Sequence, residues 1–304
     1  MTPALEPGTV LARHGRQLLV QIDAETPGSL RQAVTRGRRD DCCVGDRVRA
    51  RRIGLDQAVV EDIDPRENCI SRSDGGRTKL LAANVDQAAI VLSGDPPFSE
   101  PLLMRVLAVL ASQQVAPLII ATKTDLPLAH ARITERLDHY RSLGYPVLAL
   151  SVVQAPEDSL AKLRPVLEGR CTLLLGQSGM GKSTLVNLLV PDAEQVTREI
   201  SVALSTGRHT TSFCRMFPVA LDWSARIIDS PGFQLFGIAH LSSSELMHAL
   251  PDFVPWLGRC RFANCMHRNE PGCAIREAVE RKELDGSRLR FYQELLDDTE
   301  RPLR

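Results

Sequence analysis

The sequence predicts an α/β core with a mostly parallel sheet, an N-terminal all-β barrel of the OB type and a small C-terminal helical module. Three observations predict this: a glycine-rich loop near the middle of the chain, strands that alternate with helices around it, and a cluster of cysteine and histidine residues near the end. Alternating strands and helices indicate a parallel sheet covered by helices on both faces. We expect the three parts to span residues 1–75, 76–238 and 239–304.

The composition is that of an ordinary globular protein. The 304 residues suffice for two or three domains, and 43% of them are hydrophobic. The formal net charge is zero, so any binding to nucleic acid has to be local. No apolar run reaches the roughly 18 residues of a membrane span, and the first residues do not resemble a signal peptide. We therefore expect a cytoplasmic protein with no membrane partner, whose eight cysteines are thiols or metal ligands.

The N-terminal part has the pattern of a small closed barrel. Residues 8–72 contain short alternating runs separated by turns, which favours five strands in an OB-type barrel, a frequent platform for oligonucleotides. Arg47, Arg49 and Arg51 would share one face of a strand, either tracking RNA phosphates or forming a solvated face that nearby aspartates neutralise. Residues 73–84 contain a Gly-Gly pair and are expected to be a linker.

The core begins after this segment. Ser99 is expected to cap the first helix, with Pro101 in its first turn. We expect helices at 99–111, 129–142 and from 182 onward, and strands at 87–93, 117–122, 146–151, 171–175, 216–221 and 226–229.

A phosphate-binding loop spans residues 176–184. Gly176, Gly181, Lys182 and Ser183 match the pattern G-x-x-x-x-G-K-[ST] between a buried strand and the start of a helix. In this setting backbone N–H groups and a helix N-terminus surround a phosphate. Lys182 would reach the β- and γ-phosphates, and the Ser183 hydroxyl would ligate Mg²⁺. The residues expected to contact the nucleotide here are Gly176, Gln177, Ser178, Gly179, Met180, Gly181, Lys182, Ser183 and Thr184.

A turn with the pattern Asp-x-x-Gly follows the strand at 226–229. After a phosphate loop, an aspartate in the position of Asp229 typically holds Mg²⁺ through water, and the N–H of a glycine such as Gly232 meets the γ-phosphate. The next residue, Phe233, cannot orient water as glutamine does in many GTPases, so we expect slow intrinsic hydrolysis.

Base recognition is expected from residues Thr122, Lys123, Thr124 and Asp125, which resemble the Asn-Lys-x-Asp element of GTPases with threonine in place of asparagine. The Asp125 carboxylate can accept hydrogen bonds from N1–H and N2–H of guanine. Against ATP the carboxylate would be left unpaired, which makes binding about 1–3 kcal/mol less favourable. Lys123 would lie along the base plane, and Ser151 would contact the base. The missing asparagine amide usually reaches the base edge and ties down the phosphate loop, so we expect somewhat looser binding.

These elements occur in an unusual order. Base recognition precedes the phosphate loop, which indicates a circularly permuted P-loop GTPase whose γ-phosphate sensor leads directly into the C-terminal part. The polar segment 205–212 is expected to be the switch, with Thr210 or Thr211 as the Mg²⁺ ligand. His209 could position or deprotonate the attacking water, or it could have a structural or RNA-facing role.

Four potential metal ligands lie within fourteen residues near the C-terminus: Cys260, Cys265, His267 and Cys273. Three thiolates and one imidazole form a closed tetrahedral set that suits one structural Zn²⁺. Charged helices are expected at 272–284 and 287–298. This zinc-organised module is too small to fold well without its metal.

Together these motifs, in this order, resemble the bacterial ribosome small-subunit-dependent GTPases A across nearly the full chain. The resemblance implies a monomeric GTP hydrolase, using GTP, GDP and Mg²⁺, that binds the small (30S) ribosomal subunit and 16S rRNA late in maturation. It also implies that the subunit stimulates hydrolysis and that release follows GDP formation. The sequence departs from the family pattern at Thr122, at Val152 and at Ser212.

Three other functions remain as alternatives. A nucleotide-binding paralogue could dock on RNA without coupled hydrolysis, which the unusual residues at 122 and 233 would permit. A small-molecule kinase could use the same phosphate loop, but it would have to tolerate ATP. A DNA-binding zinc protein is disfavoured because the C-terminal segment has no recognition-helix pattern.

Overall fold

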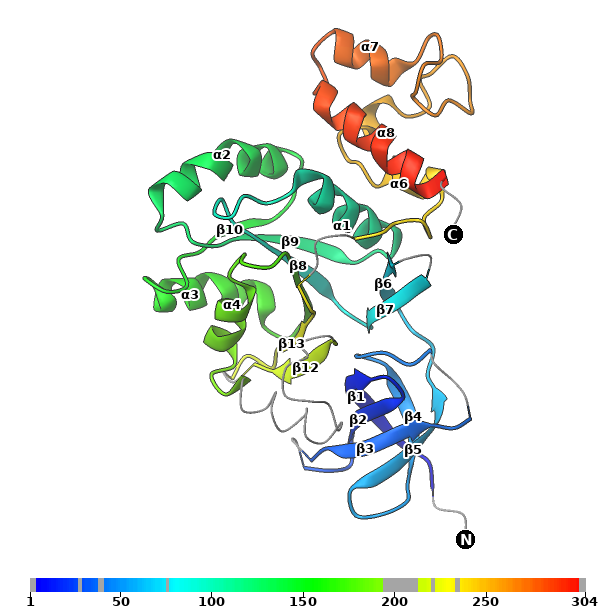
Figure 1. The fold of residues 1–304 in the computed structure, drawn as a ribbon, viewed down its shortest axis with the longest axis vertical. Coiled ribbons are helices and arrows are strands. Elements are labelled where there is room, and N and C mark those ends of the chain that lie inside the picture. The colour runs from blue at the N-terminus through cyan, green and yellow to red at the C-terminus, as the bar shows by residue number, and fades with distance from the viewer. Residues whose placement is uncertain are drawn as a thin grey trace.

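The structure is a computed structural model that describes residues 4–26, 29–37, 41–74, 77–193, 213–219, 222–232 and 236–300. Figure 1 shows a β-barrel at one end, an α/β core in the middle and a helical module at the other end. The predicted order of the three parts is therefore correct.

Five strands form the barrel, as expected. β1 (Glu6–His14) pairs antiparallel with both β2 (Gln17–Ile22) and β4 (Arg47–Arg52), which closes the barrel. β3 (Arg31–Thr35) and β5 (Gln57–Ile63) complete it. Alternate residues of these strands point inward and form a small separate core.

A hairpin replaces the predicted linker at 73–84. β6 (Cys69–Asp74) and β7 (Arg77–Ala83) pair antiparallel, and Ile70, Leu81 and Ala82 are buried. The linker prediction was wrong because a Gly-Gly pair between two short runs is also a hairpin turn signal. The hairpin lies between barrel and core, and Val44 of the barrel forms an isolated bridge with Ala82.

The core is a parallel sheet with helices on both faces, also as expected. The strand order β10-β9-β8-β11-β13 is parallel throughout, and β12 joins it antiparallel. Ser99 caps α1 by accepting a hydrogen bond from the backbone N of Leu102. The elements are β8 (Gln87–Leu92), α1 (Glu100–Ser112), β9 (Ala116–Ala121), α2 (Pro127–Ser142), β10 (Val147–Ala149), α3 (Pro156–Leu167), β11 (Cys171–Gly176), α4 (Lys182–Leu189), β12 (Arg215–Pro218) and β13 (Arg226–Asp229).

Core and barrel share one sheet. β12 pairs with β1 through Ala12 and Arg215, so strands of both parts form a continuous sheet of eleven described strands. The barrel is therefore fixed to the strand that lies two positions from the phosphate loop strand β11.

The C-terminal module contains α6 (Ser243–His248), a 3₁₀ turn (Val254–Trp256), α7 (Ala274–Glu280) and α8 (Gly286–Glu300). The two expected helices are α7 and α8. A buried ion pair joins Arg288 of α8 to Asp252 with two hydrogen bonds of 2.7 and 3.0 Å. Arg288 also reaches the hydroxyl of Tyr140 on α2, which connects the module to the core. None of the described helices is long and apolar enough to cross a membrane.

Candidate nucleotide site and metal centre

The expected nucleotide motifs meet at one edge of the sheet. Because β9, β11 and β13 are parallel, the segments that follow them emerge at the same edge. A cavity of about 540 Å³ opens there. Its lining residues are Lys123, Gln177, Ser178, Gly179, Gly181, Lys182, Ser183, Thr184, Phe213, Arg215, Asp229, Ser230, Pro231 and Gly232.

The phosphate loop has the backbone that its glycines permit. Gly179 and Gly181 have φ angles of +82° and +84°, a left-handed conformation that strains any side chain. α4 begins at Lys182, with Gly181 as its N-cap. The first N–H groups of a helix have no partner within the helix, so this N-terminus is suited to an anion in the cavity.

Lys182 and Asp229 meet beside the loop. Lys182 is 9% exposed, and its Nζ is ion-paired with Oδ1 of Asp229. The parallel register of β11 and β13 sets Asp229 opposite Leu174, two residues before Gly176. A Cβ on Gly232 would lie 3.5 Å from the backbone N of Ser178, so the Asp-x-x-Gly turn approaches the loop closely. The structure thus brings together Lys182, Asp229 and Gly232, three of the residues predicted to contact the γ-phosphate or Mg²⁺.

The base-recognition turn is joined to the phosphate loop and to the segment after β10. Lys123 has a φ of +57°, and its Nζ donates to the backbone O of Gly179 at 2.8 Å. The Ser151 hydroxyl donates to Oδ1 of Asp125 at 2.7 Å and so orients that carboxylate. Thr124 continues the turn, its N donating to Leu150 at 3.3 Å.

The absence of asparagine at position 122 was expected to remove a contact with the phosphate loop, but Thr122 makes such a contact itself. Its side chain is buried, and its hydroxyl donates to the backbone O of Met180 in the phosphate loop at 2.6 Å. The threonine therefore ties down the loop, which corrects that part of the prediction.

Replacing Thr122 with valine is expected to weaken GTP binding about fivefold. The substitution keeps the shape but leaves the buried Met180 carbonyl without its donor, at a cost of about 1 kcal/mol. Isothermal titration calorimetry with GTP and GDP measures the change. Thr122→Ser keeps the hydroxyl and should bind like the wild type, and equal affinities for all three proteins would contradict this role.

Sequence reasoning missed Arg215 of this site, and it included Gln177 without foreseeing the contact that holds its side chain. The side-chain O of Gln177 accepts a hydrogen bond from the N of Ser99 at 3.0 Å, which joins the loop to the start of α1. Arg215 of β12 lines the cavity although it is only 5% exposed, and its guanidinium stacks 4.3 Å from the centre of the Phe213 ring. Burial lowers the pKa of Arg215, a penalty that an anion in the cavity would offset. The only sign of Arg215 in the sequence was a single arginine within a short apolar strand.

Several predicted residues lie outside the described part of the chain. They are His209, Thr210, Thr211 and Ser212 of the expected switch, and Phe233.

The predicted metal ligands converge on one point. The ligand atoms of Cys260, Cys265, His267 and Cys273 all lie within 4.8 Å of one another. Nδ1 of the histidine lies 3.6, 3.5 and 3.4 Å from the sulfurs of Cys260, Cys265 and Cys273. Zinc bonds of about 2.3 Å to sulfur and 2.0–2.1 Å to nitrogen at tetrahedral angles separate these atoms by about 3.6 Å. The four residues therefore fit a zinc ion.

The surroundings of the cluster favour a bound cation. Burial lowers the pKa of His267, which keeps the imidazole neutral as a ligand. Burial also raises the pKa of Cys265 to about 12, so its thiolate needs a compensating positive charge.

The arginine face of the barrel proves to be neutralised. Arg47 pairs with Asp23, Arg49 with Asp64 at 3.0 Å, and Arg51 with Glu61 at 2.6 Å. These acids lie just after β2, within β5 and just after β5, whereas the aspartates expected from the sequence to neutralise the arginines were Asp40, Asp41 and Asp46. This favours the solvated face over the phosphate-tracking one.

Comparison with known proteins identifies the family. A family model described as RsgA GTPase matches residues 63–239, more than half of the chain. The chain belongs to the RsgA GTPase family. Relatives named "Small ribosomal subunit biogenesis GTPase RsgA" include one from Burkholderia pseudomallei, 48% identical over 297 residues and covering 98% of this chain and 93% of the relative. Another from Ralstonia pickettii is 46% identical, covering 97% and 93%.

Two solved structures share the fold. The crystal structure of YloQ, described as a circularly permuted GTPase, aligns with a TM-score of 0.69 at 27% identity and covers 97% of this chain and 95% of that one. YjeQ from Thermotoga maritima aligns with a TM-score of 0.73 at 24% identity, covering 97% and 98%, and supports the fold alone. The predictions of a permuted RsgA-type fold and of GTP hydrolysis are confirmed. Membership of this GTPase family implies GTP and GDP as ligands and Mg²⁺ as cofactor.

Proposed function

We propose that this GTPase binds the small (30S) ribosomal subunit in the cytoplasm, contacts its 16S rRNA and assists its late maturation, with slow hydrolysis that the subunit stimulates. The observation that carries this proposal is the near full-length similarity to relatives named for small ribosomal subunit biogenesis. The match runs through the barrel, the core and the C-terminal module, which we take as domains at 1–75, 76–238 and 239–304.

In the proposed mechanism, the chain positions GTP and stabilises negative charge. Ser183 and Asp229, together with Thr210 or Thr211, would hold Mg²⁺, which would supply positive charge to the phosphates. Lys182 lies beside Asp229, where its ammonium can reach the same phosphates. Asp125, oriented by Ser151, would accept the two guanine N–H groups. His209 is proposed to position water when the subunit is bound.

We also propose one structural Zn²⁺ at Cys260, Cys265, His267 and Cys273. The ion would be an organising centre for the C-terminal module, since the four ligands bring the segment before α7 together. A closed set of four protein ligands leaves no open position for chemistry.

Phosphate release by the purified protein, with and without small ribosomal subunits, tests the proposed function. We expect GTP turnover to rise at least about 10-fold with small subunits, a threshold well below the roughly 10³–10⁵ that a partner completing a GTPase site can supply. Large subunits are the matched control and should have no effect, and ATP should be rejected. Binding without stimulation would indicate the paralogue without coupled hydrolysis, and ATP turnover would indicate a kinase-like enzyme.

A further inference from the structure

A buried arginine lies where the nucleotide cavity meets the strand that joins core and barrel. Arg215 is the first residue of β12, and it lines the nucleotide cavity although it is only 5% exposed. Its backbone is held on both sides, because Arg215 pairs with Asp229 of β13 and with Ala12 of β1. A side chain on a backbone held in this way is positioned before a ligand binds.

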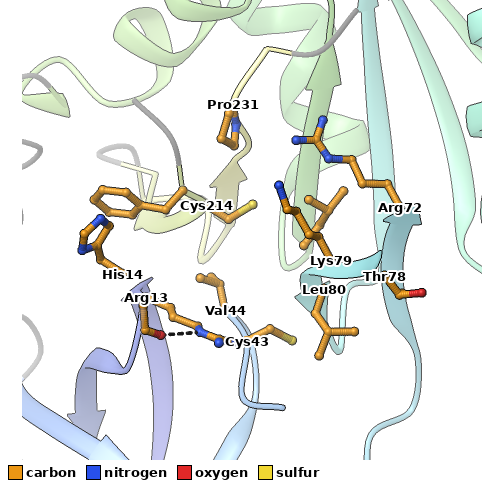
Figure 2. A pocket seen from close by; sticks show the side chains of 13 residues that line it. Arg13, His14, Cys43, Val44, Arg72, Thr78, Lys79, Leu80, Cys214 and Pro231 are labelled. Carbon is orange, nitrogen blue, oxygen red and sulfur yellow. Dashed lines mark hydrogen bonds between the residues drawn. The ribbon is translucent and has the colours of Figure 1, made fainter. Parts of the chain in front are cut away.

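The residue before Arg215 contributes to a different cavity. Figure 2 shows Cys214 in a cavity of about 430 Å³, which lies between the barrel, the β6–β7 hairpin and the core. Arg215 does not line that cavity, and Cys214 does not line the nucleotide cavity. This separation is expected, because successive residues of an extended chain point to opposite sides. The charge of Arg215 therefore belongs to the nucleotide site.

The order of the strands places Arg215 at the γ-phosphate end of that site. Across the sheet, β9 leads into base recognition, β11 into the phosphate loop and β13 into the Asp-x-x-Gly turn, in this order. A nucleotide bound along this edge would run from its base near β9 to its γ-phosphate near β13. β12 is the next strand, and because it is antiparallel to β13, its first residue lies at the edge where β13 ends.

The acid opposite Arg215 does not fully compensate its charge. Of the described residues that line the cavity, Asp229 alone is acidic, and it is ion-paired with Lys182. Burial lowers the pKa of Arg215, and the carboxylate of Asp229 opposes this effect only in part. Nε of Arg215 is buried and has no hydrogen-bond partner within the described part of the chain. A buried charged donor without a partner is unfavourable, so an anion at this end of the cavity would stabilise it.

The ring of Phe213 orients the guanidinium. Phe213 lies two residues before Arg215, on the same side of an extended chain, and it also lines the nucleotide cavity. The central guanidinium carbon of Arg215 is 4.3 Å from the centre of this ring. A guanidinium stacked on a ring keeps its N–H groups at its edges, where they remain able to donate to an anion.

We propose that Arg215 binds the γ-phosphate of GTP and thereby distinguishes GTP from GDP. A guanidinium suits this role because its fork of donors matches two oxygens of one phosphate. Of the three phosphates, the γ-phosphate is the one expected at the β13 end of the site, and it is the one that hydrolysis removes. With GDP bound, the guanidinium would again be buried without its anion. The proposal rests on the GTP site and not on the ribosomal role.

Arg215→Met tests the proposal, because methionine keeps an extended apolar side chain and removes both the charge and the donors. Isothermal titration calorimetry compares GDP with the β,γ-imido analogue of GTP, which resists hydrolysis. We expect Arg215→Met to bind the imido analogue at least about 10-fold more weakly, as for the loss of a hydrogen bond between charged groups, and to bind GDP within about 2-fold of the wild type. Arg226→Met is the matched control, because it removes an exposed arginine from the opposite end of β13, and it should match the wild type.

Thermal unfolding separates phosphate binding from a structural role. Without nucleotide, Arg215→Met should melt no lower than the wild type, because the substitution removes a buried charge that lacks a full partner. The imido analogue should raise the melting temperature of the wild type more than that of the variant. Arg215→Lys is the milder variant: it keeps the charge but loses the fork of donors, so it should bind the imido analogue about 3-fold more weakly and GDP normally.

Two outcomes would overturn the proposal. Unchanged affinity of both Arg215 variants for the imido analogue would exclude the contact, and equal losses for the imido analogue and GDP would indicate a structural role. Other failures are distinguishable from these. Wild-type protein that binds neither nucleotide would contradict the GTP site itself, whereas turnover that small subunits do not stimulate would contradict only the ribosomal role.

Discussion

Replacement of Lys182 by alanine is expected to lower kcat for GTP by at least about 100-fold while leaving the fold intact. Lys182 is the buried cation beside the phosphate loop, and it is paired with Asp229 at the cavity. Removing one preorganised donor from charge that develops in a transition state costs about 10²–10³ in rate. Single-turnover phosphate release measures the chemical step, and circular dichroism checks the fold.

Lys162 provides the matched control. Its side chain is half exposed, and it pairs with Asp158 on the surface of α3. Lys162→Ala removes the same group and should keep full turnover. Near-normal hydrolysis by Lys182→Ala would mean that the phosphate is held elsewhere.

Replacement of Cys265 by alanine is expected to release the zinc and unfold the C-terminal module. The sulfur of this buried cysteine lies 3.5 Å from Nδ1 of His267, at a distance that fits a shared metal ion. Structural zinc supplies about 10–16 kcal/mol in zinc-finger peptides, far more than so small a module stores otherwise. Metal analysis should find one zinc per wild-type chain and much less in the variant. The fluorescence of Trp256, which stacks with Arg259 and Arg281 in the module, should report unfolding.

A buried cysteine outside the cluster provides the control. Replacing it with alanine leaves a cavity without removing a zinc ligand, so it separates the two effects. Cys171 is 2% exposed at the start of β11. Cys171→Ala should keep one zinc per chain and an ordered module. Full zinc content in Cys265→Ala, or wild-type protein without zinc, would contradict the proposed site.

Local motifs were predictable because their chemistry is local. In the phosphate loop, the backbone conformation requires the glycines, and the spacing of the motif identifies Lys182. The strand, the loop and the helix could therefore all be predicted from this one segment. The zinc ligands were predictable for the same reason, since four of them occur within one short segment.

Contacts between distant segments were not predictable in this way. Arg51 pairs with Glu61 and Arg288 with Asp252 only because strand register and helix packing bring them together. The tie from Thr122 to Met180 likewise depends on where β9 ends relative to the phosphate loop. The hairpin after the barrel was missed because the Gly-Gly pair fits a flexible linker as well as a turn, and pairing with β6 decides between them.

The pairing of β1 with β12 also bears on aggregation. An unpaired strand edge can recruit another chain, and proteins protect such edges by covering or shortening them. Here the barrel strand β1 pairs with β12 at one register position, Ala12 opposite Arg215, and β4 returns to pair with β1. At the other end of the described sheet, β10 has only three residues. A chain truncated to the nucleotide-binding core would lose this contact at the edge of the GTPase sheet, so we expect it to self-associate more readily than the full chain.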